Sequence, residues 1–194
     1  MLFEPLTTTS IQLANRTVMA PMTRCRAVDA NTPNALMAEY YGQRASAGLI
    51  ITEGTSPSPN GLGYARIPGL LNDAQMRAWK RVTDAVHAKG GKIFVQLMPM
   101  DSYMGAPPVP AEFKPQLRAA FEGLFILAGD FDRTSAEDAL KAGDADLIAF
   151  ARSFLANPDL VERMRMNETL NAVDMATFYT PGPKGYTDHP SRAA

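Results

Sequence analysis

Residues 145–160 have the sequence Ala145-Asp-Leu-Ile-Ala-Phe-Ala-Arg-Ser-Phe-Leu-Ala-Asn-Pro-Asp-Leu160, which indicates how the chain is organised. The run from Leu147 to Phe150 is continuously apolar, as expected of a parallel strand buried on both faces. Ala151 and Arg152 follow, a small residue and a cation suited to an anion. Asn157-Pro158-Asp159 then supplies an N-cap, a proline for the first helical turn and an early acid. The stretch therefore predicts a βα unit with a phosphate at its mouth.

The overall composition is that of an ordinary globular protein. The chain has 194 residues, of which 46% are hydrophobic and 20% charged, and its net charge is −1. We expect a single domain spanning residues 1–194, with a small-molecule substrate and neither a nucleic-acid nor a membrane partner, because no basic block is present. The single Cys25 excludes an internal disulfide and fits a reducing compartment. With no recognisable signal peptide or membrane-length apolar run, we expect a cytoplasmic protein.

Short apolar runs alternate with segments of helical spacing along the chain. The further predicted strands are residues 17–21, 49–54, 92–98 and 124–128. The further predicted helices are residues 34–46, 72–89, 111–121 and 134–142. A capping box, Thr134 to Glu137, is predicted to open the last of these helices, and residues 1–16 are predicted to form a hairpin that closes one end of the body. Such alternation predicts an α/β fold with a parallel sheet.

The rhythm breaks once. The segment Pro99 to Pro110 carries four prolines and no periodicity, which indicates an internal junction near residues 98–104. The loop from Ser56 to Tyr64, rich in proline and glycine, is either a surface excursion or a pocket wall, since it follows a strand.

Small and polar residues stand at or within the predicted strand ends. The last two βα loops of parallel barrels often hold a phosphate, and here these loops contain Gly129 and Arg152. Thr23 and Gln96 could donate to a planar ring, which Gly54 would allow to approach the backbone. One alternative remains open for each of two residues. The backbone could satisfy the side-chain amide of Gln96, and Arg152 could be a surface arginine that follows a strand. The two histidines have no thiolate or carboxylate at ligand spacing, so no metal site is predicted.

Seven stretches resemble the old yellow enzyme family, and together they extend over nearly the whole chain. They are Asn15-Arg-Thr-Val-Met-Ala-Pro-Met-Thr-Arg24, Gly48-Leu-Ile-Ile-Thr-Glu-Gly-Thr55, Gly61-Leu-Gly-Tyr-Ala65, Val95-Gln-Leu97, Ala149-Phe-Ala-Arg152, Asn157-Pro-Asp-Leu160 and Phe178-Tyr-Thr-Pro-Gly-Pro-Lys-Gly-Tyr-Thr-Asp188. The resemblance implies a TIM-barrel oxidoreductase that binds FMN. Such an enzyme takes hydride from NAD(P)H and transfers it to activated alkenes, quinones or nitro compounds.

The resemblance also implies which residues contact the flavin ring. Pro21, Met22 and Thr23 would flank the ring, with the Thr23 hydroxyl tuning its electronics. Gly54 and Gln96 would line the pyrimidine side.

At the phosphate end, the resemblance implies that Gly129, Ala151 and Arg152 bind the phosphate, with Asp130 in the same loop. Two positions depart from the family, which usually has glycine at position 151 and glycine or asparagine at position 130. We expect Ala151 to crowd the phosphate and Asp130 to repel it unless the Asp130 side chain points away.

Tyr64 and Tyr179 would border the substrate. After Met98, however, the chain continues almost at once with a segment that the family reaches three strands later, beginning near Met104. The family's substrate-orienting His with its second His or Asn, its proton-donating Tyr and its flavin-side Arg belong to the section in between, so no equivalents are assigned here.

We therefore expect an incomplete TIM barrel of five βα units out of eight, strands 1–3 and 7–8, with impaired catalysis. Its open sheet edges favour homo-oligomers. The alternative is a non-catalytic remnant that binds FMN weakly or acts only through association.

Overall fold

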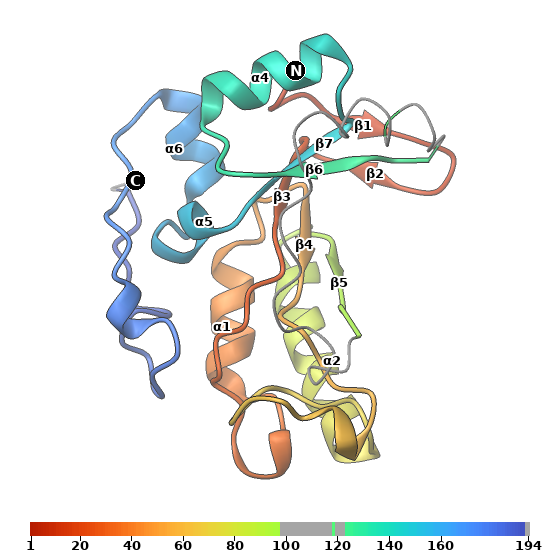
Figure 1. Ribbon diagram of the computed structural model, residues 1–194, viewed down its shortest axis with the longest axis vertical. Coiled ribbons are helices and arrows are strands. Elements are labelled where there is room, and N and C mark those ends of the chain that lie inside the picture. The colour runs from red at the N-terminus through yellow and green to blue at the C-terminus, as the bar shows by residue number, and fades with distance from the viewer. Residues whose placement is uncertain (98–117, 119–122, 193–194) are drawn as a thin grey trace.

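One parallel sheet forms the centre of the computed structural model, which describes residues 1–97, 118 and 123–192 (Figure 1). Its strand order is β5-β4-β3-β7-β6. The strands are β3 (Thr17–Met19), β4 (Leu49–Ile51), β5 (Ile93–Phe94), β6 (Ile126–Ala128) and β7 (Leu147–Phe150). The predicted α/β class and parallel sheet are confirmed. The junction near residues 98–104 and the predicted helix 111–121 lie outside the described residues, apart from residue 118.

The last strand of the chain lies beside the first strand of the sheet. Val18 in β3 aligns with Leu49 in β4 on one side and with Ala149 in β7 on the other. The side chains of these three residues form one cluster with Leu13 from the N-terminal hairpin. That hairpin pairs β1 (Leu6–Thr7) with β2 (Gln12–Leu13), which confirms the predicted hairpin, while its closing of one end stays a prediction. It therefore packs on one face of the sheet.

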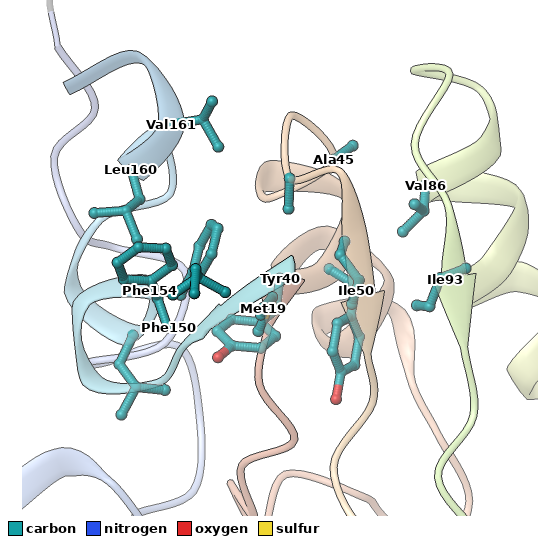
Figure 2. Packing of buried hydrophobic residues seen from close by; sticks show 14 of the residues in the cluster. Met19, Tyr40, Ala45, Ile50, Val86, Ile93, Phe150, Phe154, Leu160 and Val161 are labelled. Atoms are coloured by element: carbon teal, nitrogen blue, oxygen red, sulfur yellow. The ribbon is translucent and has the colours of Figure 1, made fainter. Parts of the chain in front are cut away.

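The α-helices pack on the opposite face. They are α1 (Ala35–Gln43), α2 (Asp73–His87), α4 (Arg133–Ala142), α5 (Arg152–Ala156) and α6 (Leu160–Met166). Each of these helices contributes to one buried cluster, which includes the alternate strand residues Met19, Ile50 and Phe150. In Figure 2 these three side chains lie among Tyr40 of α1 and Phe154 of α5. A sheet with helices on one face and hydrophobic side chains on both has the layering of a barrel wall.

Two helix starts follow ordinary capping chemistry. The Asn34 side chain accepts the Met37 N–H at 3.0 Å, and the Asn72 side chain accepts the Gln75 N–H at 3.0 Å. Each bond satisfies a donor that the first turn of a helix leaves unpaired. Short 3-10 turns also occur at Asp29–Asn31, Pro59–Gly61 and Met175–Thr177.

The predicted capping box of α4 is wrong. The box is formed two residues earlier in the chain, by Asp132 and Ser135: the Asp132 carboxylate accepts the Ser135 N–H at 2.8 Å, and the Ser135 hydroxyl accepts the Asp132 N–H at 3.0 Å. Glu137 instead accepts the Leu2 N–H at 3.0 Å and so ties the N-terminal segment to the helix. A long-range partner therefore uses the side chain that the local pattern assigned to the cap.

The predicted N-cap Asn157 is also wrong. Helix α6 begins after Asp159, and the short helix α5, which the sequence did not predict, occupies the turn after β7. The Asn157 side chain donates to the Ser153 carbonyl and accepts the Asn171 N–H, each at 2.8 Å. It fastens the chain beyond α6 to the end of α5. No helix in the described ranges has both the length and the apolar character needed to cross a membrane.

Candidate functional site

The loops that follow β3, β4 and β5 meet at one edge of the sheet, because parallel strands all end there. Hydrogen bonds join these loops directly. The Gln96 N–H donates to the Thr52 hydroxyl at 3.0 Å, and the Gln96 carbonyl accepts the Thr55 N–H at 2.9 Å. Gln96 thus lies beside the buried Gly54. The backbone of Gln96 makes these bonds, so its half-buried side-chain amide is not needed for them.

Thr23 joins the same edge through its neighbour in the chain. The Arg24 N–H donates to Glu53 Oε2 at 3.0 Å, and this bond places Thr23 next to the segment that contains Gly54. Thr23 and the adjacent Met22 are half-buried, whereas Pro21 is exposed. The structure therefore brings the predicted ring-contacting residues of three strands together.

A buried carboxylate holds these loops. Glu53 is completely buried, and its backbone N–H donates to the Tyr41 hydroxyl at 2.9 Å. Burial raises the pKa of Glu53 to about 7, while the N–H groups of Arg24 and Cys25 oppose that rise by bonding the charged form. Glu53 lies within one of the stretches that resemble the family, but no role was predicted for it. A lone acid at the end of an apolar strand was the pattern that could have singled it out.

Two buried arginines fix the C-terminal segment, residues 177–188, against the same loops. Arg24 donates through Nε to the Phe178 carbonyl at 3.1 Å and through a terminal nitrogen to the Gly185 carbonyl at 2.7 Å. Arg26 donates to the Thr177 carbonyl at 2.7 Å and also bonds the Phe178 carbonyl. Backbone carbonyls thus compensate much of the cost of burying two cations. No role was predicted from the sequence for either arginine.

Aromatic rings complete this buried cluster. The Tyr186 ring stacks on Tyr40 with centroids 3.9 Å apart, and the guanidinium groups of Arg24 and Arg26 lie 5.3 and 4.7 Å from the Tyr186 ring centroid. Such contacts stabilise a desolvated cation. Burial lowers the pKa of Arg26, first by desolvation and then through the nearby Arg24 charge.

The two tyrosines expected at the substrate lie toward solvent. Tyr64 is 45% exposed and Tyr179 is 61% exposed. Arg66 links their surroundings, because it follows Tyr64 by two residues and donates to the Cys25 carbonyl at 3.1 Å and the Tyr179 carbonyl at 3.2 Å. The predicted substrate-bordering residues therefore flank the loop after β3, near the predicted ring-contacting residues.

The four residues predicted at the phosphate gather around one pocket of about 200 Å³ at the ends of β6 and β7. Gly129 and Asp130 line it from one loop, and Ala151 and Arg152 from the other. Ala20, which follows β3 and directly precedes Pro21, also lines it. The pocket thus adjoins the segment expected to flank the ring.

This pocket fits a phosphate in position and in carrying a cation, but one residue opposes an anion. Arg152 forms an ion pair with Asp130, so the guanidinium already binds a carboxylate of the protein. Asp130 was expected to repel a phosphate unless its side chain pointed away from the pocket. The side chain lies at the pocket, where it bonds Arg152. Ala151 lines the pocket as an exposed residue, and the effect of its methyl group on phosphate stays a prediction.

Two parts of the chain match the model of a known protein family. Residues 1–112 and 111–171 match the NADH:flavin oxidoreductase / NADH oxidase family. The chain belongs to this family. The resemblance to old yellow enzymes inferred from the motifs is thereby confirmed, and the family's cofactors are FMN and, as reductant, NAD(P)H.

Curated relatives match the chain in two ways. Chanoclavine-I aldehyde reductase fgaOx3 of Penicillium roqueforti is 57% identical over 98 residues, which are 50% of this chain and 27% of that enzyme. The chain thus spans about a quarter of that relative. 12-Oxophytodienoate reductase 7 of Oryza sativa subsp. japonica is 25% identical over 371 positions, covering 97% of this chain and 94% of the rice protein. Since the chain has 194 residues, that alignment contains a long gap.

The solved structure of morphinone reductase in complex with tetrahydroNAD has a TM-score of 0.89 and 26% identity to this chain. The similarity covers 99% of this chain and 98% of the reductase. The structural neighbours are TIM-barrel enzymes of the old yellow enzyme type. The β-sheet described above is thus a parallel α/β sheet of the class found in those barrels.

Proposed function

We propose that this protein is an FMN-dependent oxidoreductase of old yellow enzyme type with impaired catalysis. It would take hydride from NAD(P)H and transfer it to activated alkenes, quinones or nitro compounds. The observation that carries the proposal is the shared sheet edge: the pocket lined by Arg152 adjoins Ala20, and the segment after Ala20 is bonded to the loops of Gly54 and Gln96. One edge thus offers an anion site and a ring site in continuity.

Each end of the cofactor would have its own residues. Arg152 and Gly129 would hold the phosphate. Thr23, Gln96 and the backbone at Gly54 would contact the ring edge, with Pro21 and Met22 beside it. When bound, FMN accepts and donates hydride, and the protein's part is to hold the ring and orient the acceptor. Tyr64 and Tyr179, both exposed at this edge, would border the acceptor.

We further propose that the fold is an incomplete barrel, with strands equivalent to the first three and last two of eight. Two observations support this. The alignment with the rice reductase needs far more positions than this chain has, and the family match falls into two pieces that meet at residues 111–112. By the family resemblance, the section absent from this chain would contain the groups that polarise the acceptor and donate a proton. Losing one preorganised donor commonly costs on the order of 10² to 10³ in rate.

A second candidate is favoured by the Arg152–Asp130 ion pair. If the carboxylate prevents phosphate from binding, the chain would be a non-catalytic remnant that binds FMN weakly or acts only through association. The flavin absorbance of the purified protein separates the two: bound, stoichiometric flavin supports the first and colourless protein that takes up no added flavin supports the second.

Turnover is tested by stopped-flow mixing of the FMN-loaded protein with NADPH, followed by cyclohexenone. We expect slow flavin reduction and reoxidation by oxygen or a quinone, and almost no enone reduction, because quinones need little positioning. Enone reduction at the rate of a full-length relative would overturn the proposed impairment. A matched control is the Glu39→Gln variant, which changes one exposed acid on α1 and should leave both rates unchanged.

A further inference from the structure

The pocket at the ends of β6 and β7 contains one charge of each sign. Among the described residues that line it, Arg152 and Asp130 are the only ionisable ones, and they bond to each other across the two loops. Their side chains are 57% and 81% exposed, so water reaches both. The cation that would attract an anionic ligand is therefore already paired at the pocket mouth.

We propose that Asp130 is a specificity-determining residue that acts against the terminal phosphate of the flavin. This inference rests on the proposed flavin function. The Asp130 carboxylate takes the position beside Arg152 that a phosphate oxygen would need, and it adds a negative charge to the same pocket. The protein then gains little from the phosphate, and it binds FMN and riboflavin, the same ring without phosphate, with similar affinity.

Charge and solvent access set the size of the effect. A phosphate monoester carries a charge of about −1.5 to −2 at neutral pH. It must displace one carboxylate from Arg152 and then remain near that carboxylate. For charges a few ångströms apart in a partly solvated pocket, the resulting loss of affinity is about ten- to hundredfold. An unpaired arginine would instead make charge-assisted bonds to the phosphate.

The backbone allows a conservative test. Asp130 has a φ of 44°, in the left-handed region that asparagine and aspartate tolerate better than most residues. Asp130→Asn therefore removes the charge and keeps both the side-chain shape and the loop conformation. Since the ion pair is exposed, its loss should affect folding little.

The experiment titrates FMN and riboflavin separately into the wild type and Asp130→Asn, following quenching of flavin fluorescence. We expect the wild type to bind the two ligands within about threefold of each other, and Asp130→Asn to bind FMN ten- to hundredfold more tightly with riboflavin unchanged. Asp138→Asn, which makes the same charge change on α4 away from this pocket, is the control and should leave both affinities as in the wild type. Equal FMN affinity in the wild type and Asp130→Asn would overturn the inference, as would a parallel gain for riboflavin.

A second probe separates this inference from the proposed function. If neither flavin binds any variant, the flavin function fails, and inorganic phosphate then tests Asp130 alone. We expect phosphate to raise the melting temperature of Asp130→Asn more than that of the wild type or Asp138→Asn, and this excess to disappear in the double variant Asp130→Asn with Arg152→Ala. Equal stabilisation of the wild type and Asp130→Asn would overturn the inference without reference to flavin.

Discussion

Glu53 accepts the backbone N–H of Arg24 at 3.0 Å, and through this bond the loop after β4 fixes the loop after β3. The side chain of the same Arg24 reaches the Phe178 and Gly185 carbonyls of the C-terminal segment. Residues far apart in sequence are thus held at one edge of the sheet by buried polar groups. The geometry of this site therefore depends on the protonation states and the hydrogen bonds of those buried groups as much as on apolar packing.

The first prediction concerns pH and Glu53. Its pKa rises from 4.5 to about 7 on folding, so the neutral acid is favoured in the folded state. The stability from this preference is fully present below about pH 4.5 and is lost as pH rises through about 7. The free energy of unfolding of the wild type should therefore fall by about 3 kcal/mol between these two pH values. Glu53→Gln, whose side chain stays neutral, should not show this fall. Urea unfolding of both proteins at pH 5 and pH 8 measures it.

The control for this experiment is Glu39→Gln, an exposed acid on α1. It should unfold with the wild-type pH dependence. Parallel pH profiles for the wild type and Glu53→Gln would show that the Glu53 carboxyl titrates alike in the folded and unfolded states, contrary to the prediction.

The second prediction compares two buried tyrosines. The Tyr186 hydroxyl has no hydrogen-bond partner among the described residues, whereas the Tyr41 hydroxyl accepts the Glu53 N–H at 2.9 Å. An unsatisfied buried hydroxyl costs free energy, so Tyr186→Phe should leave stability unchanged or raise it by about 1 kcal/mol. Tyr41→Phe should lower it by about 1 to 3 kcal/mol, because it leaves the Glu53 N–H unpaired. Thermal and urea unfolding of the two variants provide the comparison, and equal losses would contradict it.

The third prediction concerns the C-terminal segment. Arg26→Ala removes one donor each from the Thr177 and Phe178 carbonyls, which keep their bonds from the Thr180 hydroxyl and from Arg24, so residues 177–188 should detach more readily. Amide hydrogen exchange should become at least tenfold faster at Gly185 and Tyr186, with a loss of about 1 to 3 kcal/mol in stability. Arg66→Ala is the matched control, since its contact with the Tyr179 carbonyl is exposed and should matter little. Unchanged exchange in Arg26→Ala would show that other contacts hold the segment.

The strands and the family could be predicted from the sequence, whereas the buried polar cluster around Glu53, Arg24 and Arg26 could not. Runs such as Leu147 to Phe150 carry their burial in their composition, and the parallel class follows from alternation with helices. The pocket at the ends of β6 and β7 was predictable because Gly129 and Arg152 follow adjacent strands. The partners of Arg26 are backbone carbonyls about 150 residues away, which no local pattern encodes. For the same reason Glu137 and Asn157 were misassigned as capping residues, since their tertiary partners outcompete the local ones.

The last prediction concerns the lateral edge of the sheet, where β5 is the terminal strand in the described order. Phe94 aligns with Ile51, on the face opposite the helices, and is 55% exposed. An edge strand with an exposed aromatic side chain favours pairing with another chain, and lysine there discourages it. Phe94→Lys should therefore raise the dissociation constant for self-association about tenfold or more, which corresponds to about 1.4 kcal/mol. Sedimentation velocity across a concentration series measures the change. Met76→Lys replaces a similarly exposed apolar residue on α2 and should leave association as in the wild type. If both variants associate like the wild type, copies of the chain do not associate through the β5 edge.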